Sequence, residues 1–307
     1  MTNVALAHPF SSGEADVGPP ADDADRVLLP VVGSLQSRWL PTLAGALAAD
    51  KEGDLFVATV VSVPEQTPPS LTGRPLERHR DQLEGSLEAV SEAAAETPVT
   101  GVVRVGIGSV PVIAGVVREY GVSTVVLGDG DRSQPRFPYR RSAVERLRSK
   151  ASCRVVLADD GVRSTDCSSI LVPVAGGPHV DAVVDVARAV AEPHDAWIEL
   201  LHVLEPDAGT DRRERAHRLL ESSASRLDGE QWDTWLLEAE DVAEAIIEQS
   251  TYYDATVLGG PRKGRLHRFV FGSTTSAVQD RAESAVLTVW AEREPAGRLG
   301  RWLDDGR

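Results

Sequence analysis

Short apolar runs alternate with longer stretches of helical spacing along most of this chain. In the first part, this pattern predicts strands at 27–32, 55–63, 99–105, 122–127 and 153–158, and helices at 36–49, 76–95, 110–120 and 141–150. In the second part, it predicts strands at 169–174, 197–203, 232–238, 255–258 and 285–290, and helices at 180–191, 210–227, 241–251 and 272–282. Apolar strands that alternate with amphipathic helices indicate an α/β fold, with helices on both faces of a parallel sheet.

The two parts are copies of one unit. Three stretches recur in the same order, namely 27–33 as 170–176, 125–128 as 256–259 and 142–144 as 276–278. Ordered matches of this kind indicate a duplicated domain. The expected organisation is an acidic disordered tail at 1–25, domains at 26–159 and 169–292 joined by a linker, and a C-terminal tail at 293–307.

The composition is strongly acidic and poor in lysine. The net charge is −15, and among the 32 basic residues only Lys51, Lys150 and Lys263 are lysines. Such a composition predicts adaptation to a salt-rich cytosol, because salt screens the repulsion between like charges. It also predicts that the chain repels nucleic acids and anionic membranes, so that any bound anion is held by a local basic cluster.

The sequence predicts no membrane span and no export signal. Its apolar runs are far shorter than the about 20 residues that a membrane helix needs. The N-terminus lacks the basic start and the apolar core of a signal peptide. We therefore expect a cytoplasmic protein.

Residue types that usually carry catalysis or bind metals are sparse. Cys153 and Cys167 form neither a disulfide framework nor a Cys-x-x-Cys pair, so both are predicted to be reduced and structural. No Ser/His/Asp arrangement, no metal-ligand spacing and no lysine-bearing Walker loop emerges, so the expected protein is not an enzyme; slow ATP hydrolysis is the one reaction left open. His202 is interpreted as a packed, hydrogen-bonded histidine, and Trp232 and Trp235 as side chains buried against helices.

One stretch of the second part combines glycines with basic residues. A strand ends at Leu258, and a helix is predicted to begin at Gly272. The loop between them has glycines that let the backbone turn, and basic side chains without an acidic neighbour, namely Arg262, Lys263, Arg265 and Arg268. Because a helix N-terminus favours an anion, the stretch is typical of a phosphate site. An ordinary strand-to-helix turn, whose arginines relieve local repulsion, is the alternative.

The same stretch follows a known pattern: a strand, Gly-x-x-Gly, nine residues, Gly-Ser/Thr, then Ala-Val and a last strand. In this pattern and in the order of its elements, the chain resembles the universal stress protein family, and its repeat makes it similar to a tandem member. The resemblance implies two tandem five-stranded parallel sheets of strand order 3-2-1-4-5. It also implies ATP bound between the first and fourth strands. The fifth strands are expected to meet, so that one chain imitates the family's dimer.

The resemblance places a ligand site in the second domain. Gly259 matches the first glycine of the pattern, and Gly272 and Ser273 match its phosphate-binding end, whereas Arg262 stands at the second glycine. Ala175 stands where the family has an acidic residue that contacts the nucleoside, so phosphate binding is better preserved than nucleoside recognition. The expected ligand is ATP or another adenine nucleotide, with no metal site. The predicted contacts are Ala175, Val203, Gly259, Gly260, Arg262, Lys263, Gly264, Gly272, Ser273 and Thr274.

The first domain departs further from the pattern. Gly128 and Gly130 are present, but Pro138 and Tyr139 replace the Gly-Ser pair, and Val32 stands at the acidic position. Because proline lacks the N–H that an anion needs, we expect no ATP-type site in this domain.

Two functions are open at this point. In the first, a stress-response or regulatory protein of the cytoplasm binds a phosphate-bearing ligand in its second domain. In the second, both domains form a nucleotide-independent interaction module. Basic loops such as 131–150 then contact a protein partner, for example the cytoplasmic face of a membrane transporter.

Overall fold

The computed structural model describes residues 10–11, 25–33, 35, 39–66, 73–94, 97–128, 139–158, 167–229, 231–261 and 271–292. We call residues 25–158 the first half and residues 167–292 the second half. A short strand, β1 (Phe10–Ser11), precedes both halves.

Each half alternates strands and helices, as the hydrophobic pattern predicts. The first half has strands β2 (Arg26–Val32), β3 (Asp54–Ser62), β4 (Val99–Gly106), β5 (Thr124–Gly128) and β6 (Arg154–Ala158), and helices α1 (Trp39–Ala49), α2 (Gly73–Ala93), α3 (Ser109–Glu119) and α4 (Tyr139–Lys150). The second half has strands β7 (Ser169–Pro173), β8 (Trp197–Leu204), β9 (Trp232–Glu238), β10 (Ala255–Gly259) and β11 (Ala285–Trp290), and helices α5 (Val180–Ala191), α6 (Thr210–Ala224), α7 (Val242–Ser250) and α8 (Phe271–Arg281). A short 3-10 helix, η2 (Glu192–His194), follows α5.

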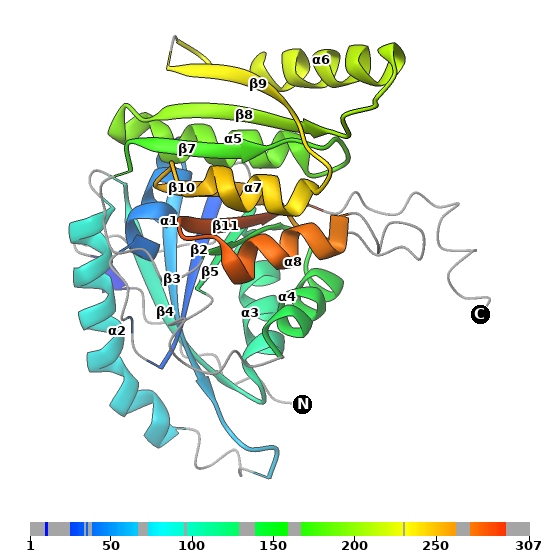
Figure 1. The fold of residues 1–307 in the computed structure, drawn as a ribbon. Coiled ribbons are helices and arrows are strands. Elements are labelled where there is room, and N and C mark those ends of the chain that lie inside the picture. The colour runs from blue at the N-terminus through cyan, green and yellow to red at the C-terminus, as the bar shows by residue number, and fades with distance from the viewer. Residues whose placement is uncertain are drawn as a thin grey trace, which may run out of the picture.

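All strands lie in one sheet, in the order β1-β4-β3-β2-β5-β6-β11-β10-β7-β8-β9 (Figure 1). Within each half, the order is the predicted 3-2-1-4-5, and neighbouring strands are parallel. The two tandem five-stranded sheets that were expected are one continuous sheet, because β6 pairs antiparallel with β11 and joins them. The fifth strands of the two halves are therefore hydrogen-bonded neighbours, whereas the likeness of this junction to a dimer of the family stays a prediction.

The N-terminal segment contributes a strand at one end of the sheet. Phe10 and Ser11 pair antiparallel with Gly101 and Thr100 of β4. The prediction of disorder is therefore wrong for these two residues, because the outer edge of β4 offers backbone groups that an extended segment can pair with. The rest of the predicted tail before Asp25, and the predicted tail at 293–307, lie outside the described residues.

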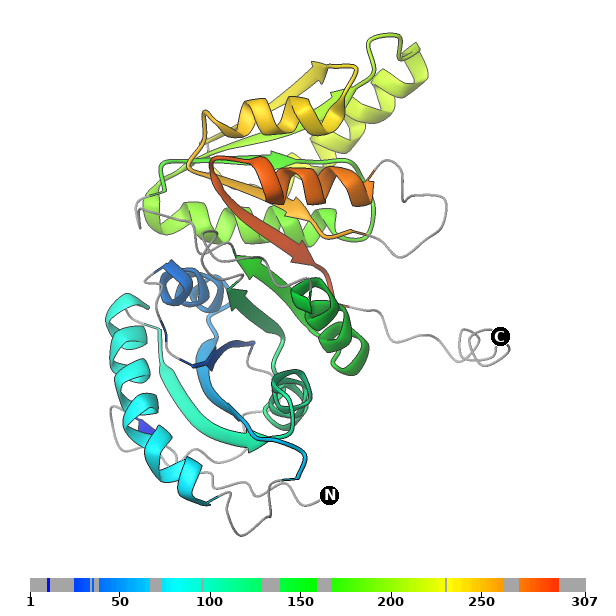
Figure 2. The ribbon, with the colours of Figure 1, turned by 60° about the horizontal axis from the view of Figure 1, so that its bottom comes forward.

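Helices cover both faces of the sheet (Figure 2). On one face, α1, α2, α5 and α6 pack over a single apolar core that runs across both halves. On the opposite face, α3 and α4 cover one core and α7 and α8 another. The junction is thus closed by a shared core on one face, and on the other face by Trp290 of β11, which belongs to the core under α3 and α4.

Polar contacts add to the junction between the halves. Helix α1 contacts α5, and the Arg188 side chain of α5 forms an ion pair with Asp50, at 2.8 Å between Nη2 and Oδ1. In addition, Arg154 of β6 lies 3.4 Å from the carboxylate of Asp185 on α5. Helix α5 therefore connects the second half to the first.

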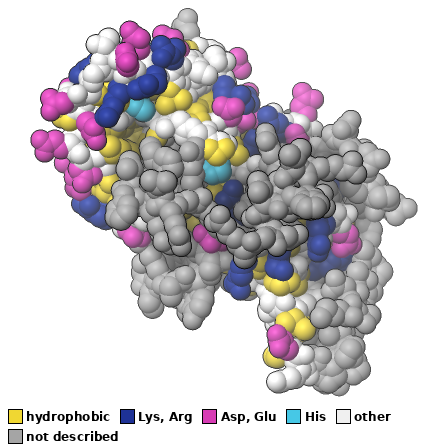
Figure 3. Space-filling view, turned by 90° about the vertical axis from the view of Figure 1, so that its right-hand side faces the viewer, with side chains coloured by type: hydrophobic (Ala, Val, Ile, Leu, Met, Phe, Trp, Pro, Cys, Tyr) yellow, Lys and Arg dark blue, Asp and Glu magenta, His cyan; other side chains and the backbone are white. Residues whose placement is uncertain are grey.

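Basic and acidic side chains are interspersed on part of the surface. Figure 3 shows basic and acidic side chains side by side over the upper part of one face. The second half has exposed ion pairs of this kind, such as Arg212 with Glu205 and Arg213 with Glu238.

Among the described helices, none combines the length and hydropathy of a membrane span.

Candidate functional site

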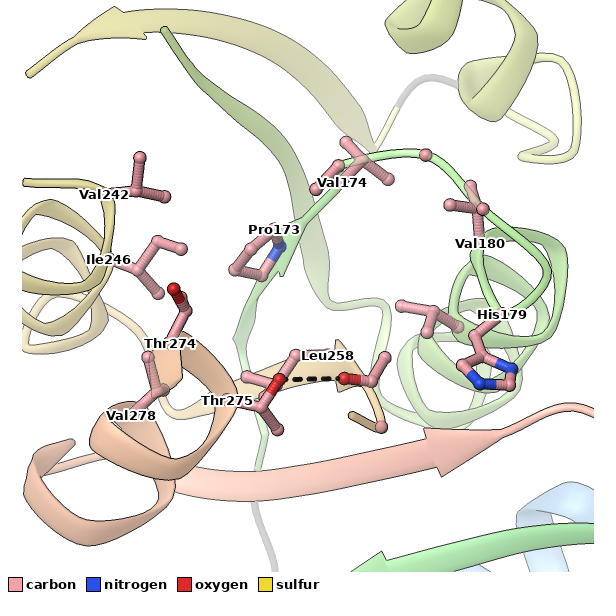
Figure 4. Close-up of a pocket in the computed structure, with 16 residues that line it drawn as sticks. Pro173, Val174, His179, Val180, Val242, Ile246, Leu258, Thr274, Thr275 and Val278 are labelled. Carbon is pink, nitrogen blue, oxygen red and sulfur yellow. Dashed lines mark hydrogen bonds between the residues drawn. The ribbon is translucent and has the colours of Figure 1, made fainter. Parts of the chain in front are cut away.

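A pocket of about 320 Å³ opens at the carboxyl ends of β7 and β10 in the second half (Figure 4). These are the first and fourth strands of that half, and between them the strand order reverses. Ligands of open parallel sheets bind at this place. The pocket is lined by Pro173, Val174, Ala175, Gly176, Gly177, His179, Val180, Val183, Val242, Ile246, Leu258, Gly259, Gly260, Thr274, Thr275 and Val278.

The walls of the pocket are mostly apolar. Val242 and Ile246 of α7 lie on one side, and Val180 of α5 lies on the other, with Pro173 and Leu258 between them (Figure 4). No acidic, lysine or arginine side chain is among these lining residues of the described chain. The pocket therefore suits an uncharged, flat or apolar group.

Gly260 fits the space after β10 because it has no side chain. A Cβ at this position would lie 1.9 Å from Nε1 of Trp290, far inside the contact distance. The backbone N–H of Gly260 donates to the carbonyl of Val289, at 2.8 Å. The floor of the pocket is thus fixed against the last strand.

The first turn of α8 is attached to the end of β10. The hydroxyl of Thr275 donates to the carbonyl oxygen of Gly259 over 3.1 Å (Figure 4). Gly272 and Ser273 lie in the same helical turn, and Thr274 lines the pocket. A helix N-terminus attracts anions, so the pocket has an apolar body next to an anion-attracting end.

The loop after β7 turns sharply at two glycines. Gly176 and Gly177 have φ angles of 79° and 104°, which residues with a side chain rarely adopt. Ala175, just before them, is exposed and lines the pocket. A larger side chain at Ala175 would therefore enter the pocket without displacing the core.

Two histidines near the pocket are held by hydrogen bonds. His202 donates from Nδ1 to the carbonyl of Val174, at 2.6 Å, which confirms the prediction of a hydrogen-bonded histidine. His179 lines the pocket, and its Nδ1 accepts from the backbone N–H of Ala291, at 3.2 Å. This contact requires a His179 ring without a proton on Nδ1.

The structure brings together six of the predicted contacts, four in the lining of the pocket and two beside it. Ala175, Gly259, Gly260 and Thr274 line the pocket together with residues of α5 and α7. Gly272 and Ser273 lie next to Thr274 in the first turn of α8. Arg262, Lys263 and Gly264 lie outside the described residues.

Val203 is the exception. It lies in β8 and does not line the pocket. It is half-buried and packs against the apolar core under α7 and α8. A ligand contact of Val203 stays a prediction.

The sequence patterns missed most of the apolar lining. Val180 and Val183 of α5, and Val242 and Ile246 of α7, were interpreted only as parts of helices. Their signal is positional: each pair is three or four residues apart, in the helical turn that follows the carboxyl end of a strand. Apolar residues at such positions face the cleft beyond the strands.

The first half can be compared with this site at the end of its first strand. The register of β2 on β3 and of β7 on β8 aligns Pro30 with Pro173, and hence Val32 with Ala175. Val32 is exposed over 56% of its surface. The loop at 129–138, where Pro138 replaces a glycine, lies outside the described residues.

Both cysteines are free and buried, as predicted. Burial raises the pKa of the Cys153 thiol to about 12, and it raises the pKa of Cys167 to about 11. Both thiols are therefore protonated at neutral pH and are poor nucleophiles. No group of side chains in the described part of the chain has the arrangement of a metal site.

Comparisons with known proteins agree with this architecture. The model of the universal stress protein family matches residues 24–158 and 168–289. A universal stress protein from Archaeoglobus fulgidus has a TM-score of 0.60 at 16% identity, over 89% of this chain and 98% of its own. A protein of the same family name from Pseudomonas aeruginosa has a TM-score of 0.55 at 14% identity, over 86% of this chain and 92% of its own.

A third structure comes from a different kind of protein. The cytoplasmic domain of a prokaryotic cation chloride cotransporter has a TM-score of 0.54 at 11% identity, over 87% of this chain and 96% of its own. At such identities, the likeness concerns the fold alone. Among curated proteins, none matches this chain in sequence.

Proposed function

The chain belongs to the universal stress protein family, and we propose that its second half binds an adenine nucleotide such as ATP and thereby regulates a cytoplasmic process. The observation that carries this proposal is the apolar pocket beside the first turn of α8. The base occupies the space between α5 and α7, where apolar side chains replace water around a flat ring. The phosphates lie at Gly272 and Ser273, where the helix dipole favours negative charge.

The phosphates carry most of the affinity in this proposal. Arg262 and Lys263 stand in the sequence between β10 and α8 and supply positive charge to the phosphates. Ala175 offers no side-chain acceptor at the edge of the pocket. Adenosine is therefore expected to bind at least about tenfold more weakly than ATP, which corresponds to about 1.4 kcal/mol.

Isothermal titration calorimetry with ATP, ADP, cyclic AMP and adenosine, in a buffer of high salt, tests the proposal. The expected result is one ATP per chain. The double variant Gly272→Ala/Ser273→Ala is expected to give no heat of ATP binding. The matched first-half variant Pro138→Ala/Tyr139→Ala is expected to bind ATP like the wild type. A wild-type chain that gives no heat with any of these ligands contradicts the proposal.

We propose a binding protein rather than an enzyme. Among the residues that line the pocket, His179 is the one ionisable side chain, and its Nδ1 accepts a backbone hydrogen bond. A general base poised toward a ligand is therefore lacking among the described lining residues. Phosphate release from ATP, followed with a colorimetric assay over hours, is expected to match the protein-free control.

The alternative is a nucleotide-independent module that regulates a partner such as a membrane transporter. The observation in its favour is the likeness of the fold to the cytoplasmic domain of a cotransporter, which covers 87% of this chain. Calorimetry separates the two candidates, because the module gives no heat with nucleotides.

A further inference from the structure

Strand β9 ends the sheet of the second half with an open outer edge. In the part of the chain that the structure describes, β8 is the one strand that pairs with β9 (Figure 1). The N–H of Ile198 donates to the carbonyl of Gln231, and the N–H of Ala239 donates to the carbonyl of Leu204. Odd-numbered residues of β9 therefore turn their backbone groups toward β8, and even-numbered residues turn theirs outward.

One backbone N–H on the outer edge of β9 is hydrogen-bonded to a side chain instead of to a neighbouring strand. Thr234 is even-numbered, and its N–H donates to the carboxylate of the adjacent Asp233, at 2.7 Å. A side chain thus occupies a donor that a neighbouring strand would otherwise use. The exposed edge is otherwise a template for another extended chain.

The first half shows how such an edge is completed. The register aligns Ala58 with Leu201 and Val102 with Trp235, so β4 corresponds to β9. By the same alignment, Gly101 corresponds to Thr234. Strand β1 pairs antiparallel with β4, and its Phe10 lies opposite Gly101. The equivalent place on β9 has no such strand among the described residues.

The face of the sheet beside this edge is open as well. Trp235 is exposed over 36% of its surface and Trp197 over 37%, so the interpretation of Trp235 as buried is wrong. The reason is that α7 packs mainly on β7 and β8. In the first half, α3 contacts β4 and buries Val102, the counterpart of Trp235.

Two carboxylates lie between these tryptophans. Glu199 and Asp233 are direct cross-strand neighbours, and like charges in this position destabilise a sheet. Nε1 of Trp197 donates to Oε2 of Glu199, at 3.3 Å. Neither carboxylate forms an ion pair with a described residue.

The carboxylates behave as an uncompensated pair. Partial burial raises the pKa of Glu199, and the nearby charge of Asp233 raises it further, while the hydrogen bond from Trp197 opposes the shift. Burial and the charge of Glu199 also raise the pKa of Tyr253, which packs at the same core. A positive charge placed here would relieve this repulsion.

We propose that β9 is a docking edge for an extended, basic segment of a partner protein, which adds to it as an antiparallel strand. This role is separate from the nucleotide site at the carboxyl ends of β7 and β10. Main-chain hydrogen bonds to the carbonyl of Thr234 and to the N–H and carbonyl of Leu236 hold the segment, as in other complexes formed by strand addition. Two cationic side chains, two residues apart, face Asp233 and Trp235, because alternate residues of a strand share one face.

Charge decides against a second copy of this chain as the occupant. Each copy carries a net charge of −15, and each β9 would bring its own Asp233 and Glu199 to the interface. A segment with arginine at alternate positions complements the same surface.

Fluorescence titration with three short capped peptides tests the proposal. The probe is Ac-Ser-Arg-Val-Arg-Val-Thr-NH2, which quenches or shifts the tryptophan emission if it docks beside Trp197 and Trp235. A second peptide has proline in place of both valines, so that its charge is kept and its strand hydrogen bonds are lost. The third has glutamate in place of both arginines. We expect the probe to bind at least about tenfold more tightly than either control peptide.

Two variants locate the site. In the first, Glu199→Gln and Asp233→Asn remove the two carboxylates of the docking edge; in the second, Asp211→Asn and Glu221→Gln remove two exposed carboxylates of α6. Both variants change the net charge equally. Only the first is expected to weaken the probe, by about tenfold, and hydrogen exchange is expected to show protection of the Leu236 N–H by the probe.

Three results would overturn the proposal: no binding of the probe to the wild type, equal binding of the proline peptide, or equal loss in the two variants. Sedimentation of the protein alone gives a further criterion. A dimer that Thr234→Pro dissociates would assign the edge to a second copy instead.

Discussion

The first and second halves have the same strand order and the same register, yet they differ at the two places where a sheet can meet other molecules. In both halves, a proline of the first strand pairs with the second strand at equivalent positions, Pro30 with Ala58 and Pro173 with Leu201. The differences lie at the carboxyl end of the first strand and at the outer edge of the third strand. The apolar pattern therefore preserves the sheet, while short loops and edges distinguish the two halves.

At the carboxyl end, the difference is one of space and backbone. Ala175 leaves the pocket of the second half open, and Gly272 begins the sequence of the anion-attracting turn. Val32 and Pro138 stand at the corresponding positions of the first half. At the outer edge, the first half is completed by β1, whereas β9 has two exposed tryptophans and two facing carboxylates.

The largest expected effect breaks the comparison at the pocket. Ala175→Trp places an indole in the pocket of the second half and is expected to weaken ATP binding about 100-fold, or about 2.8 kcal/mol. The matched variant Val32→Trp changes the equivalent exposed position of the first half and is expected to leave the affinity unchanged. Calorimetry measures both. A stronger loss of affinity with Val32→Trp would indicate that ATP binds in the first half, and it would contradict the proposal.

The second effect concerns stability at the end of β10. Gly260→Ala forces a methyl group into Trp290 and is expected to lower the free energy of unfolding by about 1–3 kcal/mol. The first half has Asp129 at the corresponding position, so the restriction is specific to the second half. Gly209→Ala is the control, because no atom lies within 4 Å of the added methyl group. Equal denaturation midpoints for the two variants would contradict this account of Gly260.

A smaller effect tests the coupling between the halves. Asp50→Asn removes the charge that Arg188 of α5 pairs with across the junction. Because the Asp50 side chain is only 3% exposed, we expect a loss of about 1–2 kcal/mol in urea denaturation. Glu205→Gln breaks the exposed pair with Arg212, and its expected loss is below about 0.5 kcal/mol. Matching losses would mean that the buried pair contributes no more than a surface pair.

The smallest effect depends on pH and concerns the third-strand edge. The pKa of Glu199 is raised in the folded state, so the contribution of this group to stability falls as the pH rises through that pKa. Glu199→Gln is therefore expected to stabilise the protein at neutral pH by a few tenths of a kcal/mol, about the size of a cross-strand charge effect. The gain should vanish at acidic pH, where Glu199 is protonated. Thermal unfolding at several pH values measures it, and a gain independent of pH would contradict the mechanism.

The hydrophobic pattern was sufficient to predict the order of strands and helices, but not to predict that the two sheets join into one. Strands such as β7 and β10 are short apolar runs between helices, and such runs can be recognised from the sequence alone. The pairing of β6 with β11 makes one sheet out of two. The meeting of these strands was expected from the family's dimer and not from the hydrophobic pattern, because no local pattern distinguishes a strand that pairs within its domain from one that pairs across domains. Strand β1 was missed because two residues in a polar segment carry no periodic signal.

The candidate site was predicted where the backbone decides and missed where side chains from distant helices meet. Gly259 and Gly260 were recognised in the sequence as a turn that follows a strand. Val183 and Ile246 look like ordinary core residues in the sequence, and only the fold brings them to one pocket. Trp235 was misjudged for a related reason, since its exposure depends on how far α7 extends across the sheet.

Hydrogen–deuterium exchange with and without ATP tests the central claim most directly, because it reads both halves in one experiment. The account predicts slower exchange in peptides that cover 173–183 and 271–278, and unchanged exchange in the matching peptides at 30–40 and 139–147. Equal protection of both halves, or protection confined to the first half, would contradict it.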